Sequence, residues 1–345
     1  MLTEYLAKVM ERKDLSISEM EEAMELLMDE SAQPLQVAAF LAALRAKGET
    51  CAEITGAVRL LLRKANLLSV RKPVLMDNCG TGGDCKGTFN ISTTAAFVAA
   101  GGGVPMAKHG NRSVSSKCGS ADVAEALGAE MPSSPERASA FLEETGIVLL
   151  FAPHFHPVMR RVAGVRKTLG VRTLFNILGP LLNPAPLTHQ VMGVFDSGMG
   201  PVLAEVLLAL GRRQGMVISG HGGFDELSLS GENRIVLFSE KGIRQEMVTP
   251  EDAGLSRRDG RELTGGNASE NAQILEEVLS GRPGAFRDVV VLNAAAVFLT
   301  AGMASGWKEG AVLAGESIDS GRAAAVLKHV RALSRQTCGE IRKSA

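Results

Sequence analysis

The sequence predicts an α/β protein in which a small all-helical domain precedes a larger domain with a mostly parallel central sheet flanked by helices. Two observations support this. Residues 1–70 carry helix signals and lack the alternation of apolar and polar residues that is typical of strands. From Pro73 onward, short apolar stretches alternate with helical segments, which is the pattern of parallel strands connected by helices. We therefore expect a helical domain over 1–70, joined by part of 164–189, and an α/β domain over 71–345.

Helix ends in the first domain can be assigned from their local sequence. A capping box at 18–21, Ser-Glu-Met-Glu, is expected to begin one helix. The segment 34–48 has proline at its start and glycine at its end, which favours a helix between them. A second capping box at 50–53, Thr-Cys-Ala-Glu, begins another helix.

The remaining elements follow from the spacing of apolar stretches. Strands are expected at 74–77, 104–107, 147–151, 190–195 and 215–219, and the helices between them at 92–100, 121–127 and 201–210. Residues 228–248 contain two further strand-like stretches separated by turns, which indicates an antiparallel excursion. The stretch 268–335 is again helical in pattern. The Pro- and Gly-rich segment 164–189 contains no acidic residue and is expected to cross between the domains, where substrate clefts often lie.

Composition excludes several classes of function. The net charge is −1 and the pI is about 6.6, so no basic surplus favours nucleic acid or an anionic membrane. A single Trp and a single Tyr offer little for base stacking. The five cysteines form no zinc-type spacing, and no secretory signal precedes them. We therefore expect a cytoplasmic protein with reduced thiols, no membrane partner and no nucleic-acid partner.

The segment 77–93, DNCGTGGDCKGTFNIST, joins an apolar strand to an apolar helix. It is not a dinucleotide-binding fingerprint, because the third glycine position is Cys85, and it lacks the Gly-Lys-Ser/Thr of a P-loop. Two interpretations remain: a tight turn that needs positive φ, or an anion site at a helix start. The groups expected to bind the anion are the N–H groups of Gly80, Gly82 and Gly83 and the side chains of Asn90, Ser92 and Thr93.

A second segment, 107–128, repeats the order of short strand, polar loop and helix. Its loop gathers side chains of the kinds that bind phosphate: Lys108, His109, Asn111, Arg112, Lys117 and several serines. The alternative is a solvated basic loop. Because the carboxyl ends of successive parallel strands meet at one edge of a sheet, the two loops together indicate a ligand with more than one phosphate group.

Asp225 and Glu226 are neighbouring carboxylates in a Gly-rich loop after another strand of the same sheet. Such a pair can hold Mg²⁺ while phosphate oxygens of a substrate complete the metal's shell. A solvated acidic loop is the alternative for any Asp-Glu pair. The position of this pair after a sheet strand favours the metal.

An arginine between domains can bind a carboxylate with two parallel hydrogen bonds, and Arg166 is a candidate. Spacing alone does not distinguish it from three other arginines nearby: Arg160, Arg161 and Arg172. His154 and His156 could suggest zinc, but no third ligand is identifiable, so a pocket wall or a structural role is the better interpretation. No hydrolase or metalloprotease motif is present.

Taken together, the motifs resemble the anthranilate phosphoribosyltransferase family. The matching stretches span nearly the whole chain: GTGGD (80–84), NIST (90–93), KHGNRSVSSK (108–117), GVRKTLGVRTLFNILGPLLNPA (164–185), DELS (225–228), GGNASENAQILEEVLSG (265–281) and LNAAAVF (292–298). GTGGD alone would not be specific, because related nucleoside phosphorylases use a similar loop. The resemblance implies a nucleoside phosphorylase/phosphoribosyltransferase-like fold and a homodimer formed through the helical domains. It also implies Mg²⁺ and the transfer of the phosphoribosyl group of 5-phosphoribosyl 1-diphosphate to anthranilate, in tryptophan biosynthesis.

The resemblance also implies roles for individual positions. Those matching the phosphoribosyl-diphosphate site are Gly80, Gly83, Asp84, Thr88, Asn90, Ile91, Ser92, Thr93, Lys108, His109, Gly110, Asn111, Arg112, Ser113, Val114, Ser115, Ser116 and Ser120. Those matching the anthranilate site are Gly80, Asn111 and Arg166, and those linked to the metal are Ser92, Asp225 and Glu226. No strong general acid or base is identifiable, and His109 is the one candidate to receive a proton after the chemical step.

Two rival functions stay open at the level of sequence. A pyrimidine nucleoside phosphorylase of similar architecture would use inorganic phosphate and would need no carboxylate pair for Mg²⁺. A non-catalytic nucleic-acid-binding relative would need a basic groove, which the net charge of −1 does not favour.

Overall fold

The computed structural model describes residues 1–113 and 117–344, with the backbone alone over 337–344, and within them a seven-stranded sheet in the order β3-β2-β1-β4-β5-β6-β7. Neighbours from β3 to β5 are parallel, and β6 and β7 are antiparallel. The strands are β1 (Met76–Asp77), β2 (Met106–Gly110), β3 (Ile147–Phe151), β4 (His189–Gly193), β5 (Gln214–Ser219), β6 (Asn233–Ser239) and β7 (Gly242–Val248). The predicted parallel sheet and its antiparallel excursion are both confirmed.

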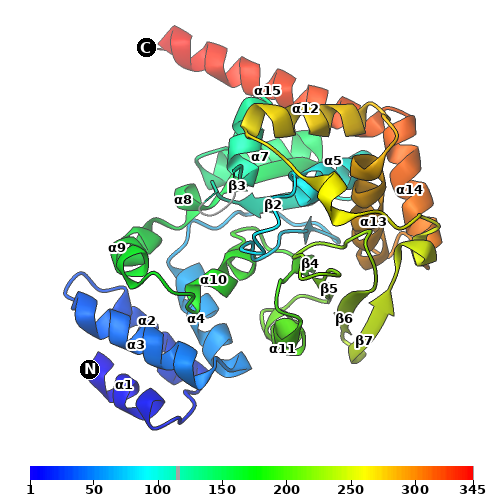
Figure 1. The fold of residues 1–345 in the computed structure, drawn as a ribbon. Helices are drawn as coiled ribbons and strands as arrows, with labels where there is room; N and C mark the ends of the chain where they lie inside the picture. The colour runs from blue at the N-terminus through cyan, green and yellow to red at the C-terminus, as the bar shows by residue number, and fades with distance from the viewer. Residues whose placement is uncertain (114–116, 345) are drawn as a thin grey trace.

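The first domain is a bundle of helices at the lower left of Figure 1. Its members are α1 (Leu2–Met10), α2 (Ile17–Leu27), α3 (Pro34–Lys47) and α4 (Cys51–Arg63). The helix between proline and glycine is confirmed as α3, and the capping box at the start of α4 is present.

The expected start of the second helix was wrong by two residues. Ser16 and Glu19 form the capping box of α2, and Ser18 is already inside the helix. Both pairs have the same spacing, so the box alone does not choose between them. The hydrophobic staple does, because Leu15 before the cap and Met20 in the first turn are both buried.

Two hydrophobic cores cover the two faces of the sheet. One packs the sheet against α5 (Ile91–Gly101) and α13 (Ala285–Thr300), and the other runs from the opposite face through α11 (Gly200–Ala209) into the helical bundle. The outer helices of the α/β domain are α6 (Ser120–Ala126), α7 (Pro135–Thr145), α12 (Ala268–Leu279), α14 (Trp307–Asp319) and α15 (Arg322–Ser344). No helix among the described residues is long and apolar enough to cross a membrane.

A crossing segment links the domains a second time, through α8 (Ala152–Phe155), α9 (Arg160–Leu169) and α10 (Phe175–Leu178). Helix α9 contacts α3 of the bundle, and Figure 1 shows it above that helix. Phe175 and Leu178 are buried in the core that includes the bundle. The segment 164–189 thus contacts the helical bundle, while the division of the chain into domains stays a prediction.

The helical domain depends on one buried carboxylate. Glu53 is 0% exposed, and it accepts hydrogen bonds from Leu15 N (3.0 Å), Thr50 N (2.9 Å) and Lys47 Nζ (3.0 Å). We predict that Glu53→Ala lowers the free energy of unfolding by about 1–3 kcal/mol, because it leaves the buried Leu15 N–H without an acceptor and removes one of the two carboxylates that pair with Lys47. Urea denaturation measures the change. The exposed Glu4→Ala is the control and should change it by less than about 0.5 kcal/mol. A Glu53 variant as stable as this control would contradict the prediction.

Candidate active site

The glycine loop begins where β1 ends and runs beside the end of β4. Gly80 forms a parallel bridge with Gly193, and Thr81 N–H donates to Gly193 O over 2.9 Å. Gly82 (φ 67°) and Gly83 (φ 78°) both have left-handed backbone, which glycine adopts without steric cost. The tight-turn interpretation is thus confirmed, and it brings the loop to the carboxyl edge of the sheet, where open α/β sheets bind ligands.

Asp225 packs directly against this loop. Gly82 N–H donates to Asp225 Oδ2 over 2.7 Å. A Cβ at Gly80 would overlap with the Asp225 carboxylate, and a Cβ at Gly193 would overlap with the Asp225 backbone carbonyl. Glycine is therefore required at both positions so that the acidic loop can approach, which is a second reason for glycine besides turn geometry.

Glu226 meets the start of α5. Ser92 N–H donates to Glu226 Oε1 over 2.8 Å. The N-cap residue Asn90 makes no side-chain cap hydrogen bond, so the Glu226 carboxylate satisfies one of the free N–H groups at this helix end. A carboxylate at this position also interacts favourably with the positive end of the helix dipole.

Lys108 connects β2 to the glycine loop and to the start of α5. Its side chain is 3% exposed, and its Nζ donates to Asn78 Oδ1 (3.3 Å) and Ser92 Oγ (3.2 Å). Asn78 in turn donates to Ser92 O over 2.9 Å. The predicted phosphate loops and the acidic pair are thus joined by direct hydrogen bonds at one edge of the sheet.

The acidic pair holds more negative charge than its surroundings neutralise. Burial, followed by the nearby Asp84 carboxylate, raises the pKa of Asp225 to about 6. Burial, followed by Asp225 itself, raises the pKa of Glu226 to about 8. Lys108 lowers the pKa of Glu226 but does not offset these causes. An added cation would relieve the repulsion.

The donor set fits Mg²⁺ that also binds a ligand's oxygens. Among the residues that the structure describes, no Lys or Arg forms an ion pair with Asp225 or Glu226. The described part of the chain also contains no cluster of three or more His, Cys, Asp or Glu placed to hold a metal. Mg²⁺ is commonly bound by one or two carboxylates, with water and substrate phosphates completing its six positions. Asp225 and Glu226 fit that mode, and they do not form a self-sufficient protein cage.

The second loop is partly described, since Val114, Ser115 and Ser116 lie outside the described residues. Arg112 Nη1 pairs with Asp122 (3.0 Å) and Glu125 (2.8 Å). Asp122 also accepts from Ser113 N (3.1 Å) and caps the start of α6. In this state the Arg112 guanidinium is neutralised by the protein, so an anion would have to compete for it.

The other predicted positions surround this network. Asn90 Nδ2 donates to Cys118 O (3.4 Å), which ties the start of α5 to the end of the second loop. Thr88 bridges to Thr264. The remaining predicted positions divide into buried side chains, Ile91 and Thr93, and partly or fully exposed ones, Asp84, Gly110, Asn111, Lys117 and Ser120. The Thr93 hydroxyl is therefore enclosed by protein, and an anion at this helix start would meet backbone N–H groups and Ser92 instead.

His109 is poorly suited to be a base. Its Nδ1 lies 3.1 Å from Gly179 O, so Nδ1 carries the proton and Nε2 is the unprotonated nitrogen. Burial, together with the neighbouring His156, lowers the pKa of His109 to about 3. His156 Nε2 donates to Leu182 O, and its Nδ1, like His109 Nε2, is a buried acceptor without a partner among the described residues. The predicted proton acceptor is thus a neutral ring that disfavours a charge.

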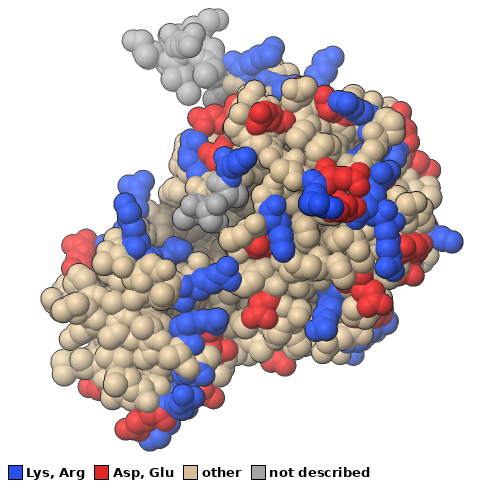
Figure 2. All heavy atoms as spheres, viewed as in Figure 1, with Lys and Arg blue, Asp and Glu red and all other residues tan. Residues whose placement is uncertain are grey.

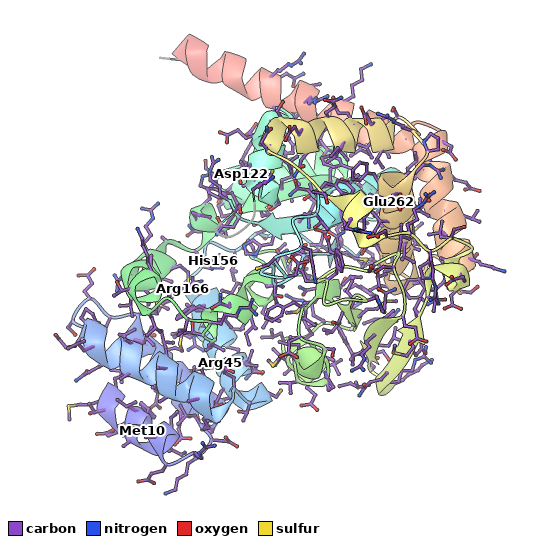
Figure 3. The ribbon with its side chains drawn as sticks, viewed as in Figure 1. Met10, Arg45, Asp122, His156, Arg166 and Glu262 are labelled. Carbon is purple, nitrogen blue, oxygen red and sulfur yellow. The ribbon has the colours of Figure 1, made fainter. Side chains whose placement is uncertain are left out.

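Arg166 lies on α9, at the junction of the helical and α/β domains (Figure 3). Its guanidinium lies 5.1 Å from the Phe175 ring centroid, and burial lowers its pKa. Among the described residues no carboxylate pairs with it, whereas Arg161 pairs with Glu30. Figure 2 shows a hollow at this junction, with Lys and Arg side chains along its edge. Arg166 is the partly buried arginine left free for an anionic ligand.

Comparison with known proteins agrees with this geometry. Residues 72–324 match the glycosyl transferase family a/b domain, and residues 3–65 match the helical bundle domain of that family. An anthranilate phosphoribosyltransferase of Moorella thermoacetica is 49% identical over 328 residues, which cover 95% of this chain and 97% of its own. One from Anaeromyxobacter dehalogenans (strain 2CP-C) is 48% identical and covers 96% of this chain and 98% of its own.

The chain belongs to the anthranilate phosphoribosyltransferase family.

Solved structures of the family have the same fold. The crystal structure of the anthranilate phosphoribosyltransferase from Thermus thermophilus has a TM-score of 0.91 at 44% identity, covering 96% of this chain and 99% of that one. The Saccharomyces cerevisiae enzyme in complex with PRPP and Mg has a TM-score of 0.89 at 30% identity, covering 97% of this chain and 98% of that one. The resemblance found in the sequence is thereby confirmed.

The candidate site of this chain contains contacts that its sequence motifs do not reveal. Gly193 and Asn78 are structural partners of the acidic loop and of Lys108, and neither stands out in a motif. Arg172, which spacing offered as a rival to Arg166, instead donates to Gly83 O (2.9 Å) and lies 4.1 Å from the Phe195 ring centroid. These contacts link residues far apart in the sequence, so local pattern could not identify them.

The raised pKa values predict a pH dependence of stability. In the metal-free protein, Asp225 and Glu226 keep protons up to about pH 6 and about pH 8, whereas the unfolded chain loses them near pH 4. The folded state therefore binds more protons in this window, and the pair's contribution to stability falls as pH rises from about 4 to about 8. We predict that Asp225→Asn with Glu226→Gln removes this decline.

Urea unfolding in EDTA at pH 5 and pH 8 measures the effect. The wild type should lose more stability between these two pH values than the double variant does. Equal losses would show that the pair is not protonated in the folded protein at the lower pH.

Proposed function

We propose that this protein transfers the phosphoribosyl group of 5-phosphoribosyl 1-diphosphate to the amine of anthranilate, giving N-(5-phosphoribosyl)anthranilate and diphosphate, in tryptophan biosynthesis. The observation that carries the proposal is the direct contact of the glycine loop and the start of α5 with the acidic pair, at one edge of the sheet. The names of the relatives, which cover almost the whole chain, support the same reaction.

Phosphoribosyl diphosphate is proposed to lie along this edge. The Thr81, Gly82 and Ser92 N–H groups already donate within the protein, so the N–H groups proposed for phosphate oxygens are those of the glycine loop and of the first turn of α5 that do not. Lys108 adds a buried positive charge close to Ser92. Residues of the second loop would complete the site, once Arg112 exchanges its carboxylate partners for phosphate.

The proposed step breaks the bond between C1 of the ribose and the diphosphate oxygen, while the amine nitrogen forms a bond to C1. The electron pair of the breaking bond leaves with diphosphate, so negative charge grows on the leaving group. Preorganised N–H groups and Lys108 stabilise that charge where it develops. Mg²⁺ held by Asp225 and Glu226, with Ser92 nearby, would supply further charge stabilisation for the diphosphate.

Arg166 is proposed to bind the anthranilate carboxylate. Its guanidinium is partly buried and has no carboxylate partner among the described residues, so a carboxylate there would form strong charge-assisted hydrogen bonds. Holding the carboxylate orients the adjacent amine toward C1, and positioning of two reactants contributes several kcal/mol to such reactions. Asn111 and Gly80 are proposed to complete this subsite, as the family resemblance implies.

The amine needs no base before it attacks, because an aromatic amine is neutral at pH 7. It loses one proton after the bond to C1 has formed. The low pKa of His109 makes that ring a weak acceptor, so we assign the proton to water or to the leaving diphosphate. His109 is instead proposed to shape the pocket wall together with His156.

The homodimer is proposed to form through the helical domains. Leu35 on α3 is 85% exposed and Met10 on α1 is 70% exposed, and α3 has small apolar residues around its outer side. A helix that is apolar all round is normally covered by protein. Figure 2 shows few charged side chains on this part of the molecule. Location in the cytoplasm stays a prediction.

The reaction is tested by mixing the protein with anthranilate, phosphoribosyl diphosphate and Mg²⁺ and following the fluorescence of anthranilate. We expect the fluorescence to fall, and the loss to require all three components. Folded protein that leaves the fluorescence unchanged would contradict the proposal. Phosphorolysis of a pyrimidine nucleoside by the same sample would then favour the phosphorylase alternative.

We predict that Arg166→Ala raises the KM for anthranilate roughly ten- to hundredfold, because a hydrogen bond to a charged group contributes about 1.5–3 kcal/mol. The KM for phosphoribosyl diphosphate should change little. Steady-state kinetics with each substrate varied in turn measure both values. Arg160→Ala, an exposed arginine on the same helix, is the matched control and should leave both unchanged. Equal rises in both KM values would refute the assignment of Arg166.

We predict that Leu35→Glu converts the dimer to monomers, because it places a charge in the proposed apolar interface. Sedimentation velocity measures the change in mass. Val312→Glu, which alters an exposed valine on α14 of the α/β domain, is the matched control and should remain dimeric. A dimeric Leu35 variant would place the interface elsewhere.

A further inference from the structure

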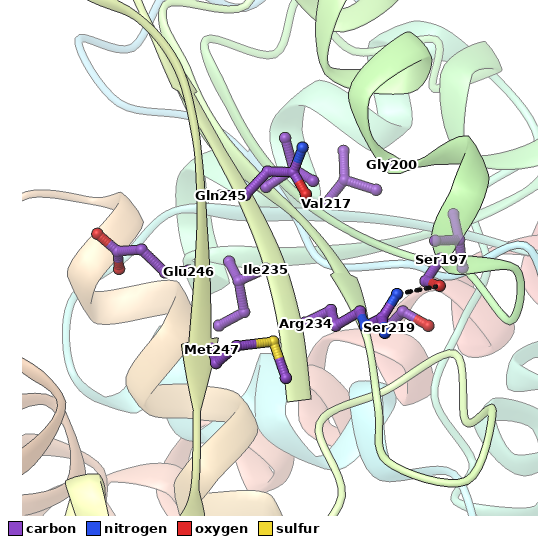
Figure 4. A pocket seen from close by; sticks show the side chains of 11 residues that line it. Ser197, Gly200, Val217, Ser219, Arg234, Ile235, Gln245, Glu246 and Met247 are labelled. Atoms are coloured by element: carbon purple, nitrogen blue, oxygen red, sulfur yellow. Dashed lines mark hydrogen bonds between the residues drawn. The ribbon is translucent and has the colours of Figure 1, made fainter. Parts of the chain in front are cut away.

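A second pocket lies on the face of the sheet that α11 covers, beyond the N-terminal end of that helix (Figure 4). It encloses about 320 Å³. Cross-strand pairing places Ser219, Arg234 and Met247 in one row of its wall, and Val217, Val236 and Gln245 in the next. The first row is polar at its centre and the second is mainly apolar, so the pocket has two chemically different parts.

The polar part contains a cation that the protein does not neutralise. Arg234 is exposed, and its Nη1 donates to Ser197 Oγ over a long 3.4 Å. Among the described residues no carboxylate pairs with it. The nearby Asp196 carboxylate accepts from Gly198 N (3.0 Å), and Glu246 pairs with Arg244 (3.1 Å). The guanidinium is therefore available to an anion.

Ser219 provides a second polar group that faces a ligand here. It is only 8% exposed, it lines the pocket, and its hydroxyl has no hydrogen-bond partner within the described part of the chain. Figure 4 shows the hydroxyl beside Arg234 and Ser197. A hydroxyl group that lines the pocket without a protein partner can donate a hydrogen bond to a bound molecule or accept one from it.

The start of α11 also lines the pocket, and the charge there depends on Arg234. This ten-residue helix begins at Gly200 on the pocket wall, and its N-cap residue makes no side-chain cap hydrogen bond. The Gly200 N–H, however, already donates to Ser197 O, and Pro201 has no N–H group. The single Arg234 guanidinium balances one negative charge, and its planar fork matches a carboxylate.

The apolar part fits the body of a small organic molecule. Val217 and Val236 line this part, and Met247, a residue that is 50% exposed, adds a flexible apolar side chain. We propose that this pocket is an accessory binding site for a small monocarboxylate with an apolar body. The carboxylate lies on Arg234 and Ser219 and the apolar body lies against Val217, Val236 and Met247.

The pocket is distinct from the candidate active site but connected to it along the chain. Five residues span the stretch 193–197 from Gly193, which contacts the acidic loop, to Ser197 in the pocket. Ser219 lies at the end of β5, and the following loop leads to Asp225. A bound molecule would therefore contact the ends of two segments that hold the acidic loop in place.

The test uses full-length protein that carries ¹³C-methyl methionine. It follows the NMR signal of the Met247 Cε-methyl group, which is identified by its loss in Met247→Leu. Titrations with 3-phenylpropionate are made in Arg166→Ala, which removes binding of the carboxylate at the candidate active site. We expect a saturable shift, with an affinity at least about tenfold higher than that for the uncharged 3-phenylpropanol. Arg234→Gln should weaken binding by a similar factor and Ser219→Ala severalfold.

Arg244→Gln, on the neighbouring strand, is the matched control and should bind as the parent does. The proposal is overturned by a shift that does not saturate, or by equal binding to the parent and to Arg234→Gln. Inorganic phosphate that binds as tightly as 3-phenylpropionate would overturn the assignment of a carboxylate with an apolar body.

Discussion

The candidate site depends on the close approach of three backbone segments at the ends of β1, β4 and β5. Gly80, Gly193 and the backbone of Asp225 meet so closely that no Cβ fits at either glycine. This approach places one carboxylate on the glycine loop and the next on the start of α5. The proposed phosphate-binding groups and the acidic pair are therefore arranged by steric fit before any ligand binds, which lowers the free-energy cost of assembling the site.

The same arrangement leaves the free protein electrostatically strained. Burial raises the pKa values of Asp225 and Glu226, and a neighbouring carboxylate raises each further: Asp84 acts on Asp225, and Asp225 acts on Glu226. Lys108 offsets part of this charge from β2. An acidic pair without a cationic ion-pair partner among the described residues, close to Lys108 and to a helix start, is what the proposed joint binding of a divalent cation and a phosphorylated sugar requires. Each ligand then improves the site for the other.

The sequence predicts this organisation well where the signals are local. The strand-loop-helix order places both loops at one edge, and proline, glycine and capping residues locate α3 and α4. It fails where a three-dimensional contact decides. The Ser16 and Ser18 boxes are equivalent until Leu15 is known to be buried, and Gly193 is unremarkable until Asp225 lies against it. His109 looks like a base in sequence, and only burial beside His156 makes it a poor one.

The central claim is that Asp225 and Glu226 bind Mg²⁺, and that this Mg²⁺ raises the affinity of the protein for phosphoribosyl diphosphate. Isothermal titration of phosphoribosyl diphosphate, with and without Mg²⁺, tests it most directly in the wild type and in Asp225→Asn with Glu226→Gln. Glu251→Gln with Asp252→Asn, another neighbouring acidic pair, is the matched control. The account predicts that Mg²⁺ raises the affinity of the wild type and of the control and leaves that of the Asp225/Glu226 variant unchanged. An equal gain from Mg²⁺ in all three proteins would contradict it.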